Sequence, residues 1–372
     1  MKPLEGIRIV ELARILAGPW CGQLLADLGA EVVKVERPGA GDDTRHWGPP
    51  FLRDADGANL DAAYYHSCNR GKTGRAIDIS TTQGQAEVRS LVAEADVVIE
   101  NYKVGGLIKY GLDHAALSAN HPRLVTCSIT GFGQTGPYAH RAGYDFIIQA
   151  MGGFMSLTGE PDGPPQKAGI AYADIFTGVY SAVAILAALR QRDSTGRGAH
   201  IDMALLDTQV AVLANQALNW MASGRVPHRM GNGHANLTPY QAFPTQDGEL
   251  VIAVGNDSQF ARLCRVLGLT LADEPAYATN PARLAHRDSL IATLEAATRR
   301  WPRDALADAL ETAGVPAGPI NAVDQVFADP QVVARGLAIT PGGLPGVAGP
   351  IVIDGVRMVS DRASPRLAAN DA

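Results

Sequence analysis

Hydrophobic and polar residues in the N-terminal half of the chain follow the order expected of an α/β fold. The pattern predicts a buried strand over residues 6–12, a helix over residues 18–29 and a second strand over residues 31–36. A helix between two such strands forms a βαβ unit, which requires a parallel sheet and a right-handed crossover. The same pattern predicts a further helix and two further strands, at residues 82–95, 96–100 and 124–130. This half is therefore predicted to be α/β and Rossmann-like.

A long helix is predicted from Tyr172 to Arg190, because apolar side chains recur there at helical spacing, at Ile175, Val179, Val183 and Leu186. Most of this helix is expected in the core, so only its N-terminal end can carry chemistry. A strand at residues 200–203 and a long helix at about residues 205–222 follow it. Residues 225–236 are a polar connection with glycines, and the composition changes there.

A separate α/β segment is predicted at residues 240–325, with a strand at residues 250–254 and three helices, at residues 258–267, 287–297 and 303–313. A tail rich in Pro and Gly then leads to a last strand at residues 351–358, and residues 362–372 are expected to be frayed. At 372 residues the chain is too long for one comfortable core, which indicates two domains.

Composition narrows the class of function. The formal net charge of −6 argues against nucleic acid or an anionic membrane as the partner. No run of about 18 uncharged apolar residues is present, and the N-terminus leads directly into a strand, so we expect a cytoplasmic protein. The four cysteines are far apart and form no Cys-x-x-Cys pair, which makes a metal site improbable: Cys21, Cys68, Cys127 and Cys264.

Asp174 is the first candidate for chemistry, because it lies where a loop becomes the helix predicted from Tyr172. A carboxylate in the first turn of a helix faces unpaired backbone N–H groups and the positive end of the helix dipole, which favour its ionised form. An ionised and positioned carboxylate can act as a nucleophile. The alternative is that Asp174 only caps the helix, since acidic residues are common in first turns.

A nicotinamide dehydrogenase is a second hypothesis, because Glu36 ends the second strand where a dinucleotide-binding protein places its ribose carboxylate. The turn at residues 17–22, however, lacks the Gly-x-Gly-x-x-Gly pattern. Pro19 in this turn also removes a backbone N–H that a bound pyrophosphate would use. The turn therefore disfavours this hypothesis.

Several segments, in order and at natural spacing, together resemble the class III CoA-transferases: Pro3–Leu12, Leu16–Pro19, Leu28–Pro38, Gly41–Arg45, Glu100–Tyr102, Thr130–Tyr138, Gly143–Asp145 and Thr195–Gly198. The resemblance implies a large Rossmann-like CoA-binding domain at residues 1–225, completed by residues 326–372, and a small α/β domain at residues 226–325. It also implies a homodimer in which two chains interlock as rings.

By this resemblance Asp174 is the nucleophile that attacks an acyl-CoA thioester, and Tyr144 and Asp145 match a Tyr-acidic pair near the active site. A racemase branch of the family has His in place of Tyr144. A phenol, with an ordinary pKa of about 10, is a poor base at neutral pH, so Tyr144 favours transfer over racemisation. Gly231 and Gly233 match a mobile glycine loop that covers the aspartyl intermediate in relatives; the alternative is a flexible interdomain connection.

For CoA, the resemblance implies five contacts with the nucleotide or its phosphates: Arg37, Lys72, Asn101, Tyr102 and Lys109. Lys109 replaces an Arg of many relatives, which puts a bidentate phosphate contact there in doubt. CoA would enter as a thioester co-substrate, with no permanently bound cofactor and no metal. The partners expected are an acyl-CoA and a small carboxylic acid.

The chain looks most like the branch that uses succinyl-CoA with glutarate or related dicarboxylates, on the segments Arg37–Phe51 and Pro239–Phe243. Leu16 replaces a Gln of some oxalate-pathway relatives, which disfavours oxalate as substrate. Arg45 is a candidate to hold the far carboxylate of a dicarboxylate, unless it pairs internally with Asp42 or Asp43. The alternatives are a 2-methylacyl-CoA racemase and a non-catalytic acyl-CoA binding protein.

Overall fold

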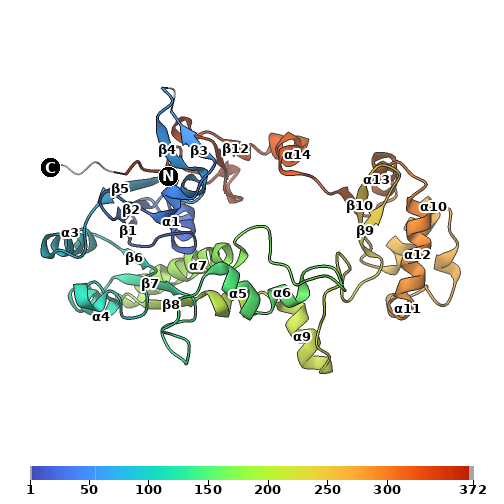
Figure 1. Ribbon diagram of the computed structural model, residues 1–372, viewed down its shortest axis with the longest axis horizontal. Helices are drawn as coiled ribbons and strands as arrows, with labels where there is room; N and C mark the ends of the chain where they lie inside the picture. The colour runs from blue at the N-terminus through green and yellow to red at the C-terminus, as the bar shows by residue number, and fades with distance from the viewer. Residues whose placement is uncertain (1, 55, 368–372) are drawn as a thin grey trace. The chain divides into compact units, whose positions relative to one another are not determined.

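The computed structural model describes residues 2–54 and 56–367 (Figure 1). The chain divides into two compact units. The first contains the described residues of Met1–Phe154, Lys167–Ala214 and Pro330–Ala372, and the second contains Met155–Gln166 and Asn215–Asp329. The domain boundaries expected at residues 225 and 325 stay predictions.

A parallel sheet of six strands forms the centre of the first unit, in the order β5-β2-β1-β6-β7-β8. The strands are β1 (Arg8–Glu11), β2 (Glu31–Glu36), β5 (Lys72–Ala76), β6 (Val97–Glu100), β7 (Val125–Thr130) and β8 (His200–Ala204). This is the doubly wound order of a Rossmann sheet, which confirms the predicted α/β fold with a central parallel sheet. The strand order reverses between β1 and β6, and such a reversal leaves a crevice at the carboxyl ends of the strands.

Helices cover both faces of this sheet, α1 (Ala17–Asp27) and α7 (Tyr172–Thr195) on one face and α3 (Thr82–Ala93) and α4 (His114–Asn120) on the other. Figure 1 shows α1 and α7 side by side. Alternate side chains of the strands face the two layers: Ile9 and Ile99 pack with α1 and α7, whereas Val10 and Val98 pack with α3 and α4. Each of these strands therefore contributes side chains to two hydrophobic cores, one on each face of the sheet.

Helix α7 continues five residues beyond its predicted end, to Thr195, and Gly196 ends it in the left-handed conformation with φ 71°. By length and composition alone, α7 could cross a membrane. In the structure its buried face, with Thr177, Ser181 and Ile185, packs into the unit. A core helix meets the same criteria as a membrane span, so α7 by itself indicates no membrane.

Two predicted elements are wrong. The helix at about residues 205–222 is two helices, α8 (Leu205–Ala211) and α9 (Ala214–Ser223), because Ala214 has a φ of 46° that no helix continues through. The single strand at residues 351–358 is a hairpin of β14 (Val352–Ile353) and β15 (Val356–Arg357). Its turn is Asp354-Gly355, with both φ angles positive, which is the pair that a tight hairpin turn favours.

The C-terminal tail makes hydrogen bonds beyond residue 361, within the stretch that was expected to be frayed. The Arg362 carbonyl accepts from Gly71 N–H at 3.0 Å and the Pro365 carbonyl from Arg45 at 3.1 Å, so fraying does not begin at residue 362. The end of the predicted frayed stretch, residues 368–372, lies outside the described residues.

The second unit has an antiparallel sheet in the order β11-β10-β9, with β9 (Tyr240–Pro244), β10 (Glu249–Ala253) and β11 (Ala317–Pro319). Its helices include α9, already described, and α10 (Asp257–Leu267), α11 (Asn280–Ala285), α12 (Arg287–Thr298), α13 (Arg303–Thr312) and α14 (Val323–Ala328). Phe243, Leu250, Leu290 and Leu306 are fully buried in its own core. The three helices predicted at residues 258–313 are confirmed within one residue at each end.

Shorter elements complete the chain: β3 (Phe51–Arg53), β4 (Asn59–Ala62), α2 (Ala63–His66), α5 (Asp145–Met151), α6 (Phe154–Leu157), α15 (Pro330–Ala334), β12 (Ala338–Ile339) and β13 (Gly346–Val347). One of them, α5, begins where the backbone of Gly143 crosses that of Gly131, just past the end of β7. A side chain on either glycine would collide with the other backbone. This crossing brings the start of α5 to the carboxyl end of the sheet.

Candidate active site

A cavity of about 1010 Å³ opens at the carboxyl ends of β1, β6 and β7. Residues 14–17 after β1, residues 101–106 after β6 and residues 129–131 of β7 and its loop form much of its wall. This is the reversal point of the strand order, where doubly wound sheets bind ligands. The cavity brings together six of the predicted site residues: Asn101, Tyr102, Lys109, Tyr144, Asp145 and Asp174.

Asp174 is the third residue of α7, and its helix lacks a cap of its own because the N-cap residue is Ala171. The cap comes instead from Asp145, at the start of α5. Its Oδ1 accepts the N–H of Ala173 at 2.8 Å and that of Asp174 at 3.3 Å. The first-turn donors of α7 are thus bonded to Asp145, and Asp174 lines the cavity.

Burial, and then the nearby Asp145 carboxylate, raise the pKa of Asp174 to about 7. The position at a helix start led us to expect an ionised group. In the structure, the effect of burial on the pKa of Asp174 outweighs the effect of the helix terminus, because the nearest N–H donors of α7 bond to Asp145. A carboxyl group so perturbed in a cleft is typical of a catalytic residue.

Tyr144 precedes Asp145 and is the N-cap residue of α5. Its side chain is 62% exposed and lines the cavity. It is therefore accessible to a ligand, as the resemblance implied.

A second cavity, of about 440 Å³, adjoins the first. It is lined by Glu36 at the end of β2, by Arg37 and residues 40–43 after it, and by residues 77–80 after β5. The two cavities share four lining residues: Arg14, Asp43, Tyr102 and Tyr110. An ion pair of 2.7 Å between Arg14 and Asp43 lies where they meet.

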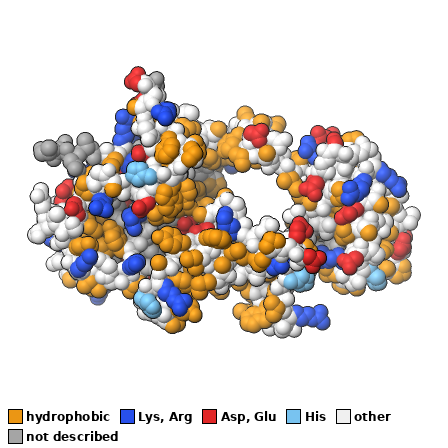
Figure 2. Space-filling model, viewed as in Figure 1, with side chains coloured by type: hydrophobic (Ala, Val, Ile, Leu, Met, Phe, Trp, Pro, Cys, Tyr) orange, Lys and Arg blue, Asp and Glu red, His pale blue; other side chains and the backbone are white. Residues whose placement is uncertain are grey.

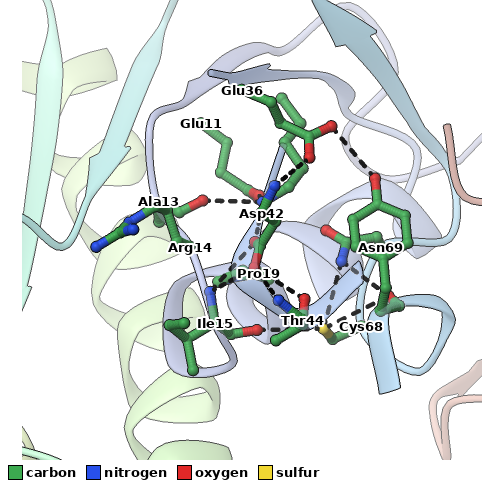
Figure 3. Close-up of polar contacts among 12 residues, drawn as sticks. Glu11, Ala13, Arg14, Ile15, Pro19, Glu36, Asp42, Thr44, Cys68 and Asn69 are labelled. Carbon is green, nitrogen blue, oxygen red and sulfur yellow. Dashed lines mark hydrogen bonds and ion pairs between the residues drawn. The ribbon is translucent and has the colours of Figure 1, made fainter. Parts of the chain in front are cut away.

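The loop after β1 is held by buried charges (Figure 3). Lys34 is fully buried, with its Nζ 3.2 Å from Glu11, 3.0 Å from Asp42 and 2.9 Å from the Ala13 carbonyl. Burial opposes the charge on Lys34, but Glu11 and Asp42 outweigh it and raise the pKa of this lysine. Asp42 also accepts the N–H of Ile15 at 3.2 Å, and Ile15 has a φ of 73°, which is rare for a β-branched residue. The charges thus stabilise a strained segment of the cavity wall.

Asn101 holds the same loop from β6. Its Oδ1 accepts the Arg14 N–H at 2.9 Å and its Nδ2 donates to the Arg14 carbonyl at 2.7 Å. Asn101 therefore shapes the cavity with its amide, besides lining it.

Known proteins resemble this chain over nearly its whole length. The family described as CoA-transferase family III matches residues 4–371. The chain belongs to CoA-transferase family III. A succinate–glutarate CoA-transferase of Agrobacterium fabrum is 57% identical over 100% of this chain and 94% of that protein. A succinyl-CoA:glutarate CoA-transferase of Mus musculus is 46% identical over 91% of this chain and 77% of that protein.

The fold agrees with this assignment. The crystal structure of a CaiB/BaiF family protein from Brucella suis matches with a TM-score of 0.89 and 58% identity, covering 99% of this chain and 97% of that one. The predicted resemblance and the predicted CoA-transferase activity are confirmed.

Lys72 differs from the other predicted CoA contacts, because it is fully buried and lines neither cavity. Its Nζ donates at 2.9 Å to Glu11, to the Pro19 carbonyl and to Asn69 Oδ1. Three partners occupy its three hydrogens, so in this arrangement Lys72 offers none to a phosphate of CoA. It holds the first turn of α1 to β1 instead.

Arg45 does not face the cavity of this CoA-transferase. It is 1% exposed and pairs bidentately with Glu36, at 2.9 and 2.6 Å, and with Asp61 at 2.6 Å. It also donates to the Tyr65 hydroxyl at 2.7 Å and lies over the Tyr65 ring. The hypothesis that Arg45 holds the far carboxylate of a substrate is therefore wrong, and its partners are carboxylates other than the two neighbouring aspartates.

Gly231 and Gly233 belong to the second unit. Gly231 has a φ of 54° and donates its N–H to the Gly159 carbonyl at 3.0 Å, and Gly233 donates to the Met230 carbonyl at 2.9 Å. Arg229 Nη2 donates to the Gly163 carbonyl at 2.8 Å, which ties the loop to the same segment. The role of these glycines as a lid stays a prediction.

Sequence reasoning missed three side chains near Asp174. One is Tyr64, whose pKa is raised by burial and then by the charge of Asp174. Trp47 lines the cavity and packs edge-on against Tyr64. Arg141 also lines it, with its guanidinium 3.9 Å from the centre of the Tyr138 ring. Trp47 lies within the segment Arg37–Phe51 and Arg141 lies between two segments of the family pattern, whereas no sequence signal marks Tyr64.

Proposed function

We propose that this protein transfers CoA from succinyl-CoA to glutarate or a related small dicarboxylate, through a covalent thioester on Asp174. The position of Asp174 carries this proposal: it is a carboxyl group at the start of a core helix, on the wall of the large cavity. The substrates are supported by the 57% identity with a succinate–glutarate CoA-transferase.

The chemistry needs only the carboxylate and the thioester. An Asp174 oxygen attacks the thioester carbonyl, the C–S bond breaks, and CoA thiolate leaves a mixed anhydride. The thiolate then attacks the aspartyl carbonyl, which releases succinate and leaves an aspartyl-CoA thioester. The carboxylate of the acceptor repeats these two steps in reverse order, so the thioester energy is conserved.

CoA is long enough to need both cavities. We place its nucleotide in the cavity lined by Arg37, because a guanidinium can bind a phosphate bidentately. Its pantetheine arm would pass the residues that both cavities share, including Tyr102, toward Asp174. Lys109, on the larger cavity wall, is then available to a second phosphate.

The far carboxylate of the acceptor needs a cation, and we assign it to Arg141. Among the described residues no acidic group pairs with Arg141, and stacking on Tyr138 orients its guanidinium. A planar guanidinium can hold a carboxylate bidentately. Arg14, in contrast, is already paired with Asp43.

We also propose an interlocked homodimer in the cytoplasm. Val179, Tyr180 and Val183 of α7 are 39%, 44% and 57% exposed, which is unusual for a core helix. Figure 2 shows hydrophobic side chains exposed over α9 as well, where Met221 is 67% exposed. A second copy of the chain would cover such surfaces. Four free cysteines fit a reducing compartment.

A trapping experiment tests the nucleophile. Incubation with succinyl-CoA alone should load the peptide that contains Asp174 with an adduct that hydroxylamine removes, because a thioester and an anhydride are both sensitive to it. Mass spectrometry of the digested protein is the measurement. Asp174→Ala should give no adduct, and turnover by a wild-type protein whose Asp174 is never modified would refute the mechanism.

A further inference from the structure

Gln149 is a fully buried residue of α5, one turn beyond Asp145, and its side-chain amide uses both of its polar atoms. Nε2 donates to Asp145 Oδ2 at 2.7 Å, and Oε1 accepts the N–H of Ala168 at 2.8 Å. Nε2 also lies 3.5 Å from the Ile170 carbonyl. A carboxylate only accepts and an N–H only donates, so the orientation of this amide is defined by its partners.

These bonds connect the three parts of the site that must be placed together. Gln149 binds the segment at residues 168–170, which leads directly into α7, and it holds one oxygen of Asp145. The other oxygen of Asp145 binds the first turn of α7, at Ala173 and Asp174. Since α7 has no cap of its own, this chain of bonds determines where its first turn lies.

We propose that Gln149 is a positioning residue for the transferase reaction: it orients Asp145, and through Asp145 it places the Asp174 carboxyl group for attack on the thioester. This rests on the proposed function, in which Asp174 is the nucleophile. Gln149 lines neither cavity, so its effect is on the chemical step and not on the binding of CoA.

The size of the effect follows from the geometry that attack requires. A carboxylate oxygen must approach the thioester carbon in line, and a displacement of about 1 Å can reduce a rate ~100-fold. Removal of the amide frees Asp145 Oδ2 and the Ala168 N–H together. The first turn of α7 then loses the support of its cap.

The chain offers a matched control. Gln209 of α8 is also fully buried and packs beside Gly152 at the end of α5, but neither atom of its amide has a hydrogen-bond partner among the described residues. Gln149→Met and Gln209→Met remove the same group at similar volume. Only the first breaks the connection to Asp145.

The test is a single turnover of the full-length enzyme with succinyl-CoA, followed by quantification of the adduct on Asp174, beside calorimetric binding of CoA. Gln149→Met should slow adduct formation roughly 10- to 100-fold and change the Kd for CoA less than about threefold. Gln209→Met should form the adduct at the wild-type rate. Wild-type kinetics in Gln149→Met, or equal slowing in both variants, would overturn the proposal.

A second variant decides the matter even if Gln149→Met does not fold. Gln149→Glu places a carboxyl group 2.7 Å from Asp145, so the two must share a proton. The other ionisable groups near them are Asp174, Tyr64 and Lys167, whose Nζ donates to the Ala168 carbonyl. Adduct formation should therefore decline as pH rises from 6 to about 8.5, whereas it rises in the wild type. A wild-type slope refutes the role of Gln149.

The trapping experiment with the wild-type enzyme distinguishes a failure of the Gln149 proposal from a failure of the proposed function. If the wild-type enzyme turns over without any adduct on Asp174, the proposed function fails, whatever Gln149 does. If the wild-type adduct forms and the Gln149 variants form it as the wild type does, Asp174 is supported as the nucleophile and the positioning role of Gln149 is refuted.

Discussion

Asp145 and Asp174, two of the carboxyl groups that line the cavity, differ in their hydrogen bonds, because backbone N–H groups of α7 donate to Asp145. The Asp145 carboxylate accepts two N–H groups from α7 and one from the side-chain amide of Gln149. Asp174 is removed from water beside that charge. Their surroundings thus separate a structural carboxylate from a reactive one, as in other enzymes with two carboxyl groups in one site.

The activity should therefore depend on pH through Asp174. Its carboxyl group attacks only when deprotonated, and its pKa is about 7 in the free protein. We expect kcat/KM for succinyl-CoA to rise with pH, to reach half of its maximum near pH 7 and to level above about pH 8. Asp145→Asn should move the midpoint down, because it removes the neighbouring charge but keeps an acceptor for the helix. A rate profile that is flat between pH 5.5 and 8 would contradict this.

Substrate selection should depend on Arg141 and not on Arg45. Loss of a desolvated charge-assisted contact costs about 2–3 kcal/mol, so Arg141→Met should reduce the preference for glutarate over butyrate ~30–100-fold. The measurement is the ratio of kcat/KM for the two acceptors. An unchanged ratio would show that Arg141 does not bind the far carboxylate of the acceptor.

Arg45→Met is the matched comparison, with a different expected result. It leaves the buried Glu36 without its partner, which should lower the free energy of unfolding by about 3–5 kcal/mol. The selectivity of the folded fraction should stay as in the wild type.

At the scale of residues, the sequence identifies the candidate site residues that lie in family motifs. It does not predict whether a basic side chain will bind a ligand or a buried carboxylate. Asp174, Tyr144 and Asp145 were found by their motif, and the cavity brings them together. Lys72 was expected to contact CoA because of the family resemblance, and Arg45 was expected to bind substrate because it follows two aspartates in a loop where a ligand could be met. Whether a basic residue meets a buried carboxylate instead depends on strands far apart in sequence.

At the scale of elements, α1 lies on the sheet only because two of its residues have no side chain. A Cβ on Gly22 would collide with Glu11 Oε2, and one on Gly18 would collide with Ala13. The predicted βαβ unit followed from hydrophobic periodicity, which locates elements well. Periodicity did not reveal the break at Ala214 or the hairpin at Asp354-Gly355, since both depend on single residues with positive φ.

Gly22→Ala should therefore destabilise the protein, although alanine favours helix formation. The added methyl displaces Glu11, which pairs with both Lys34 and Lys72 in a dry site. We expect a net loss of ~2 kcal/mol in the free energy of unfolding, from denaturant titration. Gly169→Ala is the control, because nothing lies within 4 Å of its Cβ position, and it should change stability by less than about 0.5 kcal/mol. Equal stability of the two variants would show that α1 can shift.

At the scale of the whole molecule, the parallel α/β sheet and the segment at residues 240–325 were predicted from sequence, because each buries its own core. Strand β5 and the order of the strands in the sheet were not predicted. The first unit draws on three separate segments of the chain, and no local pattern encodes that. The proposed association of two copies is a further step. It was implied by the family resemblance, and the exposed apolar side chains of α7 and α9 now support it.

An interlocked dimer makes a prediction that an ordinary dimer does not. Two rings that pass through one another cannot separate while both are folded, so subunits should not exchange between native dimers. We expect a mass of twice 39.1 kDa in sedimentation. Two tagged forms, mixed when folded, should give no dimers with both tags over days. After they are denatured and refolded together, about half of the dimers should carry both tags.

A Val183→Glu variant should refold poorly, because it places a charge in the face that the second copy would cover. Rapid exchange between native dimers would refute interlocking while leaving a dimer, and a species of 39.1 kDa would refute both.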